Sequence, residues 1–71
     1  MTVSSQQAER LLNGSHTFKQ LGFSMLLTRL KMVFAKDSSP SSIEYCAEEI
    51  NAFLEKFSTI MKEDLVIISK I

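Results

Sequence analysis

The sequence predicts an all-α fold, an antiparallel helical hairpin of two long helices with a short N-terminal helix before it. Apolar residues recur at three- and four-residue steps on both sides of residues 37–42, the only polar, breaker-rich stretch in the middle of the chain. With 71 residues, the chain is expected to form a single helical domain over 1–71. A composition of 45% hydrophobic and 23% charged residues is that of a folded chain rather than a disordered one.

The first predicted helix is short and covers about 4–13. Ser4 or Ser5 can cap its start, and Asn13-Gly14 is a typical C-terminal signal. At under three turns, this helix needs other elements to pack against.

The second predicted helix runs over about 16–36. Thr17 and Gln20 have the spacing of a capping box, and good helix formers follow to Lys36 with only Gly22 interrupting. A loop over 37–40 is then expected to reverse the chain.

The third predicted helix runs over about 41–70. Ser39 reads as an N-cap with Pro40 at the first helical position. The β-branched tail 65–68 also resembles a buried strand, but the sequence offers no second strand to pair with it. Helices of these lengths would be rods of roughly 32 and 45 Å, so the hairpin is expected to be elongated. The last turns of the third helix would then extend past the second, and the first helix could cover them.

Helix 16–36 carries more apolar surface than one neighbouring helix can cover. On a helical wheel, one broad stripe contains Phe23, Leu26, Leu27, Leu30, Val33 and Phe34. A second stripe contains Phe18, Leu21, Met25 and Met32. We expect this second stripe, with Leu65 and Ile68 at the end of the third helix, to bind another protein.

Two explanations of the second stripe are open. In one, the first helix folds onto it and closes a three-helix monomer. In the other, the stripe is an interface with another chain, either a second copy or a helical chaperone partner, and the isolated chain self-associates or is marginally stable.

The charges and the single cysteine indicate which partners and which cellular compartment to expect. Eight basic residues balance eight acidic ones, so no overall field attracts nucleic acid or a membrane. Cys46 excludes an intramolecular disulfide and fits a reducing compartment, so the expected location is cytoplasmic. The first 15 residues have no apolar signal segment, and no run is long enough to span a membrane. Any export would use a route other than the general secretory signal.

Residues for catalysis are lacking, so we expect no enzymatic activity, cofactor, metal or small-molecule substrate. His16 is the only imidazole and lies at a helix start, and Cys46 lies on an apolar face. Leu21-Gly22-Phe23-Ser24 has some likeness to the turn of a helix-turn-helix, which leaves a small DNA-binding regulator as an alternative. The apolar residues after it do not suit a recognition helix.

Three stretches resemble the small two-helix co-chaperones of type III secretion needles. They are Ala8-Glu9-Arg10-Leu11-Leu12, the run from Leu21 to Lys31, and the Pro40 loop with the acidic-then-apolar helix after it. The resemblance implies a cytoplasmic hairpin that binds a tetratricopeptide-like chaperone, the pair holding the needle subunit until export. Needle-type structural subunits, which are similar hairpins with a Pro-containing loop, are the neighbouring possibility. The function expected from the sequence is therefore that of a small non-catalytic helical protein-binding module.

Overall fold

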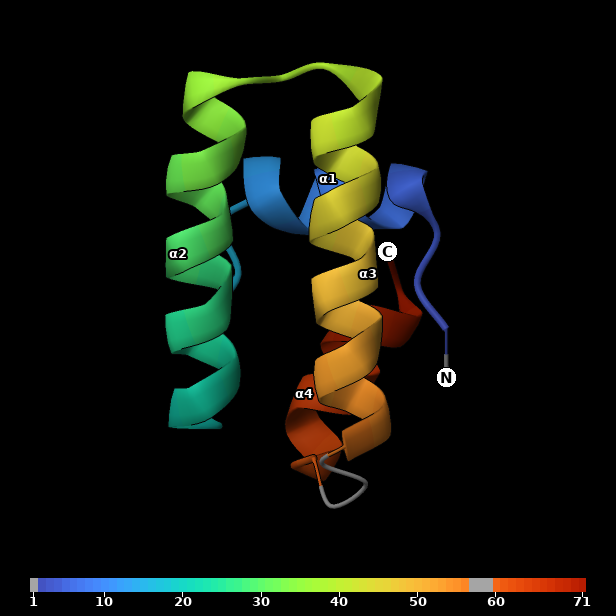
Figure 1. Cartoon of the computed structure of the whole chain (residues 1–71). Coiled ribbons are helices and arrows are strands. Elements are labelled where there is room, and N and C mark those ends of the chain that lie inside the picture. Colours follow the sequence, from blue (N-terminus) through green and yellow to red (C-terminus); the bar gives the residue numbers. More distant parts are fainter. Residues whose placement is uncertain (1, 57–59) are drawn as a thin grey trace.

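The computed structural model of the chain describes residues 2–56 and 60–71. Over these ranges the chain is helical and contains no strand, with α1 (Ser5–Asn13), α2 (Leu21–Lys36), α3 (Pro40–Lys56) and α4 (Lys62–Ser69). The all-α prediction is therefore confirmed. In Figure 1, α2 and α3 lie side by side, joined at one end by a short connection, and α1 contacts both of them.

The short N-terminal helix forms where the sequence predicts it. Ser4 caps α1: its Oγ accepts a hydrogen bond from the N–H of Gln7 at 3.2 Å, while the Gln7 side chain accepts one from the Ser4 N–H at 2.9 Å. The helix ends at Asn13, with the N–H of Gly14 donating to the carbonyl of Arg10. Before the helix, the side chain of Asn51 in α3 pairs with both the N–H and the C=O of Val3, at 2.7 and 2.8 Å.

The predicted start of the second helix at residue 16 is wrong, because α2 begins at Leu21. Residues 15–18 have no regular structure, and the expected capping box does not form. The main-chain N–H groups of Lys19 and Gln20 donate instead to the two carboxylate oxygens of Asp64, at 2.8 and 2.9 Å. Gln20 is extended at this point, and Phe18 enters the core rather than joining a helical stripe.

The predicted single helix over 41–70 is also wrong. Ser39 and Pro40 begin α3 as expected, the Ser39 Oγ accepting from the N–H of Ser42 at 3.3 Å. The helix ends at Lys56, Ile60 and Met61 are not helical, and α4 follows at Lys62. The expected helical turn at 57–59 lies outside the described residues.

Because the helix does not continue through Ile60 and Met61, the molecule is compact, with principal extents of 31 × 20 × 20 Å. A continuous helix over 41–70 would be roughly 45 Å long and would carry its last apolar residues beyond α2. In the folded chain both Ile60 and Ile68 are buried. The expected elongated hairpin is therefore replaced by four helices around one core.

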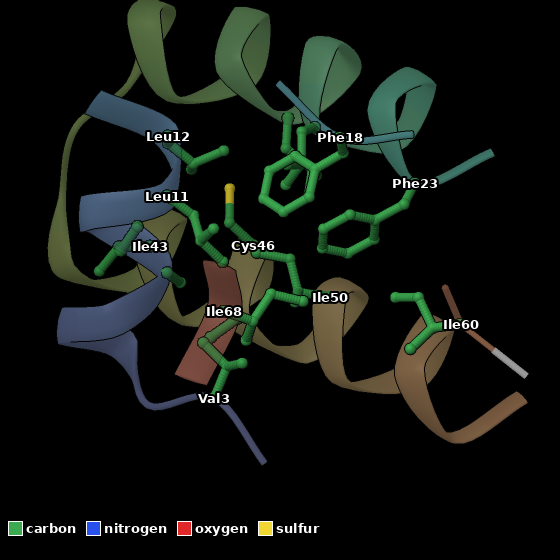
Figure 2. Close-up of a cluster of buried hydrophobic side chains, with 14 residues drawn as sticks. Val3, Leu11, Leu12, Phe18, Phe23, Ile43, Cys46, Ile50, Ile60 and Ile68 are labelled. Atoms are coloured by element: carbon green, nitrogen blue, oxygen red, sulfur yellow. The ribbon is translucent and has the colours of Figure 1, made fainter. Parts of the chain in front are cut away.

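Every helix contributes to that core (Figure 2). Phe18 and Phe23 meet edge to face with their ring centroids 4.9 Å apart. The ring centroid of Phe53 lies 5.4 Å from that of Phe23. The buried apolar residues are Val3, Ala8, Leu11, Leu12, Phe18, Phe23, Leu27, Leu30, Ile43, Cys46, Ala47, Ile50, Ile60 and Ile68.

Candidate protein-binding surface

The side of α2 that faces away from the core is apolar. Leu21, Met25 and Met32 expose 72%, 62% and 63% of their surface, far more than core side chains do. In Figure 1, α2 stands at the edge of the molecule with the other helices to one side of it. We call the surface formed by Leu21, Met25, Thr28, Met32 and Ala35 the α2 outer face; Thr28 and Ala35 are also exposed.

The α2 outer face is continuous along the helix. Leu21, Met25, Thr28 and Met32 line one shallow depression of about 460 Å³, with Ser24 and Arg29 at its borders. The hydroxyl of Thr28 donates to the carbonyl of Ser24 at 3.0 Å, so the polar atom of this side chain already has a partner. A partner that covers Thr28 would therefore leave no unsatisfied hydroxyl beneath it.

One border of the α2 outer face is fixed by an ion pair to α3. The Arg29 Nη2 lies 3.2 Å from Oε1 of Glu49, which also accepts a hydrogen bond from the hydroxyl of Tyr45 at 3.3 Å. Hydrogen bonding with Tyr45 and with Glu49 raises the pKa of Arg29. Arg29 is thus held toward α3, beside the apolar surface rather than over it.

The remaining charges on α2 are two exposed lysines, Lys31 and Lys36. Within residues 2–56 and 60–71, neither has an acidic group at ion-pair distance. Because α2 contains no acidic residue, the surroundings of its outer face are basic.

The six residues predicted for protein binding do not form one surface. Leu21, Met25 and Met32 are brought together on the α2 outer face, whereas Phe18 and Ile68 are 8% and 3% exposed and belong to the core. Leu65 is half-buried and packs against the same core. Phe18 was assigned to the stripe only because the second helix was expected to begin before it.

The contribution of Thr28 and Ala35 was missed by the sequence analysis. The signal was present, since Leu21, Met25, Thr28, Met32 and Ala35 follow alternating steps of four and three residues. A search for large apolar residues alone passes over the two smaller members of this pattern.

Other exposed apolar residues are dispersed. Tyr45, Met61 and Val66 expose 43%, 41% and 47% of their surface, and they come from α3, the segment before α4 and α4. Among the described elements, α2 carries three exposed large apolar residues, whereas the others carry at most one each.

The two candidate reactive side chains lie in different surroundings, one buried and one exposed. Cys46 is completely buried, and its desolvation raises the pKa of its thiol. His16 is exposed before α2, with its ring centroid 6.2 Å from that of Phe18. Among the described residues, no three His, Cys, Asp or Glu side chains are grouped so as to hold a metal ion.

The turn required by the DNA-binding alternative is not formed. Leu21-Gly22-Phe23-Ser24 is the first turn of α2, so this segment does not separate two helices. Phe23 points into the core (Figure 2). No helix within the described part of the chain is long and apolar enough to cross a bilayer.

No known protein family, curated protein or solved structure was found to match this chain.

Proposed function

We propose that this chain is a non-catalytic protein-binding module that docks another protein on the α2 outer face. The observation that carries the proposal is the exposure of Leu21, Met25 and Met32 in a row on the side of α2 opposite the core. Contiguous exposed apolar surface on a small domain is typical of a binding site.

Burial of the α2 outer face would stabilise a complex. A large aliphatic side chain contributes roughly 1.5 to 3 kcal/mol when it passes from full exposure to full burial. The three large residues of the α2 outer face could therefore contribute several kcal/mol to a complex. Two of them are methionines, whose flexible thioethers adapt to a partner surface.

Within this class, the finer proposal is a cytoplasmic co-chaperone of a type III secretion needle subunit, acting with a tetratricopeptide-like chaperone. Its support is the resemblance of the sequence stretches, together with an apolar helix face left over for another chain. The needle-type structural subunit is the alternative. The four helices of the described residues differ from the hairpin that both resemblances imply, so they do not separate the two.

In-cell photo-crosslinking tests the proposal. A benzophenone amino acid at position 25 should yield a discrete cross-linked product in cells of the source organism, because Met25 is an exposed large residue of the α2 outer face. The matched control places the same group at Glu48, which is exposed on α3. Adding Leu21→Asp to the position-25 chain should remove the product, since an unpaired carboxylate opposes burial of the apolar face.

Two results would contradict the proposal. Cross-linking from position 48 but not from position 25 would place the interface on α3. No product from position 25 would show that the α2 outer face stays uncovered in the cell.

A further inference from the structure

We propose that the partner element is an amphipathic α-helix with acidic residues beside its apolar seam. This inference rests on the proposed function and adds the chemistry of the partner. It follows from the spacing of the α2 outer face, the charges along its borders and the partners those charges already have.

The spacing of the residues in the α2 outer face indicates that the partner element is a helix. Leu21, Met25, Thr28, Met32 and Ala35 occur at steps of four, three, four and three residues, the a and d positions of a heptad pattern. The row spans about 21 Å along the helix, long enough for two heptads of a second helix. The smaller Thr28 and Ala35 alternate with larger neighbours, which leaves room for incoming side chains.

The charged residues on both sides of the row favour a partner helix with acidic residues. In heptad terms, Gly22, Arg29 and Lys36 flank the row on one side, and Ser24 and Lys31 flank it on the other. None of the five is acidic. Arg29 already pairs with Glu49, whereas Lys31 and Lys36 are exposed without an acidic partner among the described residues. Acidic residues at the flanking positions of an incoming helix would pair with these two lysines.

The same basic residues make a second copy of this chain an unfavourable partner for the α2 outer face. Two α2 helices paired in parallel through their outer faces would place Lys31 of one copy near Lys36 of the other. An antiparallel pair would instead bring like flanks together, and every charged residue on those flanks is basic. Either arrangement adds repulsion that an acidic helix removes.

Two designed peptides separate these possibilities. Both are fluorescently labelled helices of about three heptads with leucine at the a and d positions. One has glutamate at every e and g position and the other has lysine there, so each repels itself and stays monomeric. Fluorescence anisotropy of each peptide is measured while the full chain is added.

The glutamate peptide should bind about tenfold or more tightly than the lysine peptide near physiological salt, and added salt should reduce the difference. The double variant Lys31→Glu, Lys36→Glu should reverse the preference. Met25→Asp should lose both peptides. All three positions are exposed, so circular dichroism of the variants should match that of the parent chain.

Three other results would each contradict the inference, and each has a different meaning. Equal binding of both peptides, lost in Met25→Asp, would show a helix-binding face without charge selection and would leave the proposed function standing. Binding of neither peptide would exclude a helical occupant of this kind, and position-25 cross-linking would still decide the proposed function. A dimer of the chain that Met25→Asp dissociates would identify the occupant as a second copy.

Discussion

Gly22 lies in the first turn of α2 with a negative φ, so its backbone conformation suits any L-residue. A Cβ at this position would lie 3.4 Å from the Phe53 ring, which is an ordinary van der Waals distance. Gly22→Ala should therefore raise the free energy of unfolding by about 0.5 to 1 kcal/mol, since alanine lowers the entropy of the unfolded chain and favours helix. Urea unfolding followed by circular dichroism measures the change.

Gly14 provides the contrast for that experiment. Its φ is also negative, but a Cβ there would lie 2.9 Å from the carbonyl oxygen of Arg10 and 2.5 Å from the His16 ring. The histidine can move aside, whereas the Arg10 carbonyl belongs to the last turn of α1. Gly14→Ala should therefore destabilise the chain. Equal effects of the two substitutions would show that helix propensity does not decide the outcome at Gly22.

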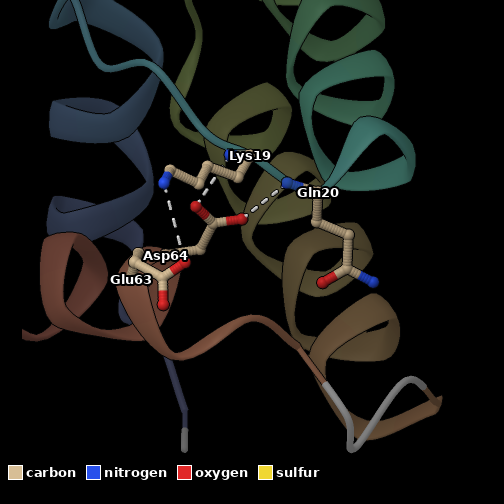
Figure 3. Close-up of polar contacts among 4 residues, drawn as sticks. All are labelled: Lys19, Gln20, Glu63 and Asp64. Atoms are coloured by element: carbon tan, nitrogen blue, oxygen red, sulfur yellow. Dashed lines mark hydrogen bonds and ion pairs between the residues drawn. The ribbon is translucent and has the colours of Figure 1, made fainter.

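At the scale of elements, α4 is attached to the start of α2 by one carboxylate (Figure 3). Asp64 is completely buried and accepts the N–H groups of Lys19 and Gln20. In return, Oε1 of Gln20 accepts the N–H of Met61 at 3.2 Å. Asp64 therefore fixes both the first residue of α2 and the position of α4.

Replacing Asp64 with alanine should lower the free energy of unfolding by about 2 to 4 kcal/mol, because two part-buried main-chain N–H groups lose their charged acceptor. The neighbouring Glu63 is the control. It forms an ion pair with Lys19 at 3.8 Å, but both side chains are more than half exposed. Glu63→Ala should change stability by less than about 0.5 kcal/mol. Similar losses in the two variants, measured in urea, would argue against the structural role of Asp64.

At the scale of the whole molecule, the charges beside the α2 outer face lead us to predict the oligomeric state. The charged residues that flank this face, Arg29, Lys31 and Lys36, are all basic, so two copies paired through it would repel each other. The expectation of self-association stays untested, and because of this repulsion we now predict a monomer whose melting temperature does not depend on concentration.

Size-exclusion chromatography with light scattering checks this prediction over a wide range of concentrations. The chain should elute with the mass of a single copy, and dilution should leave its thermal melt unchanged. A mass that rises with concentration in the parent chain but not in Met25→Asp would contradict it.

Local interactions explain which predictions from sequence succeeded. The Ser4 cap, the end of α1 at Asn13 and the start of α3 at Ser39-Pro40 depend on residues close together in the chain, so their spacing reveals them. The helical period of α2 likewise placed Leu21, Met25 and Met32 on one side of a helix, three of the six predicted binding residues.

Long-range contacts decided the rest. The start of α2 at Leu21 rather than residue 16 depends on Asp64, more than forty positions away in the sequence, and no local pattern shows that pairing. The same holds for Phe18, which helical spacing assigned to the second stripe, and for Ile68, which was expected to bind a partner at the end of the third helix. The folded chain buries both. The sequence by itself determined that the chain is helical and that α2 has more apolar surface than one neighbour can cover. Only the tertiary structure decided which of that surface remains exposed, because burial depends on where the chain turns back on itself.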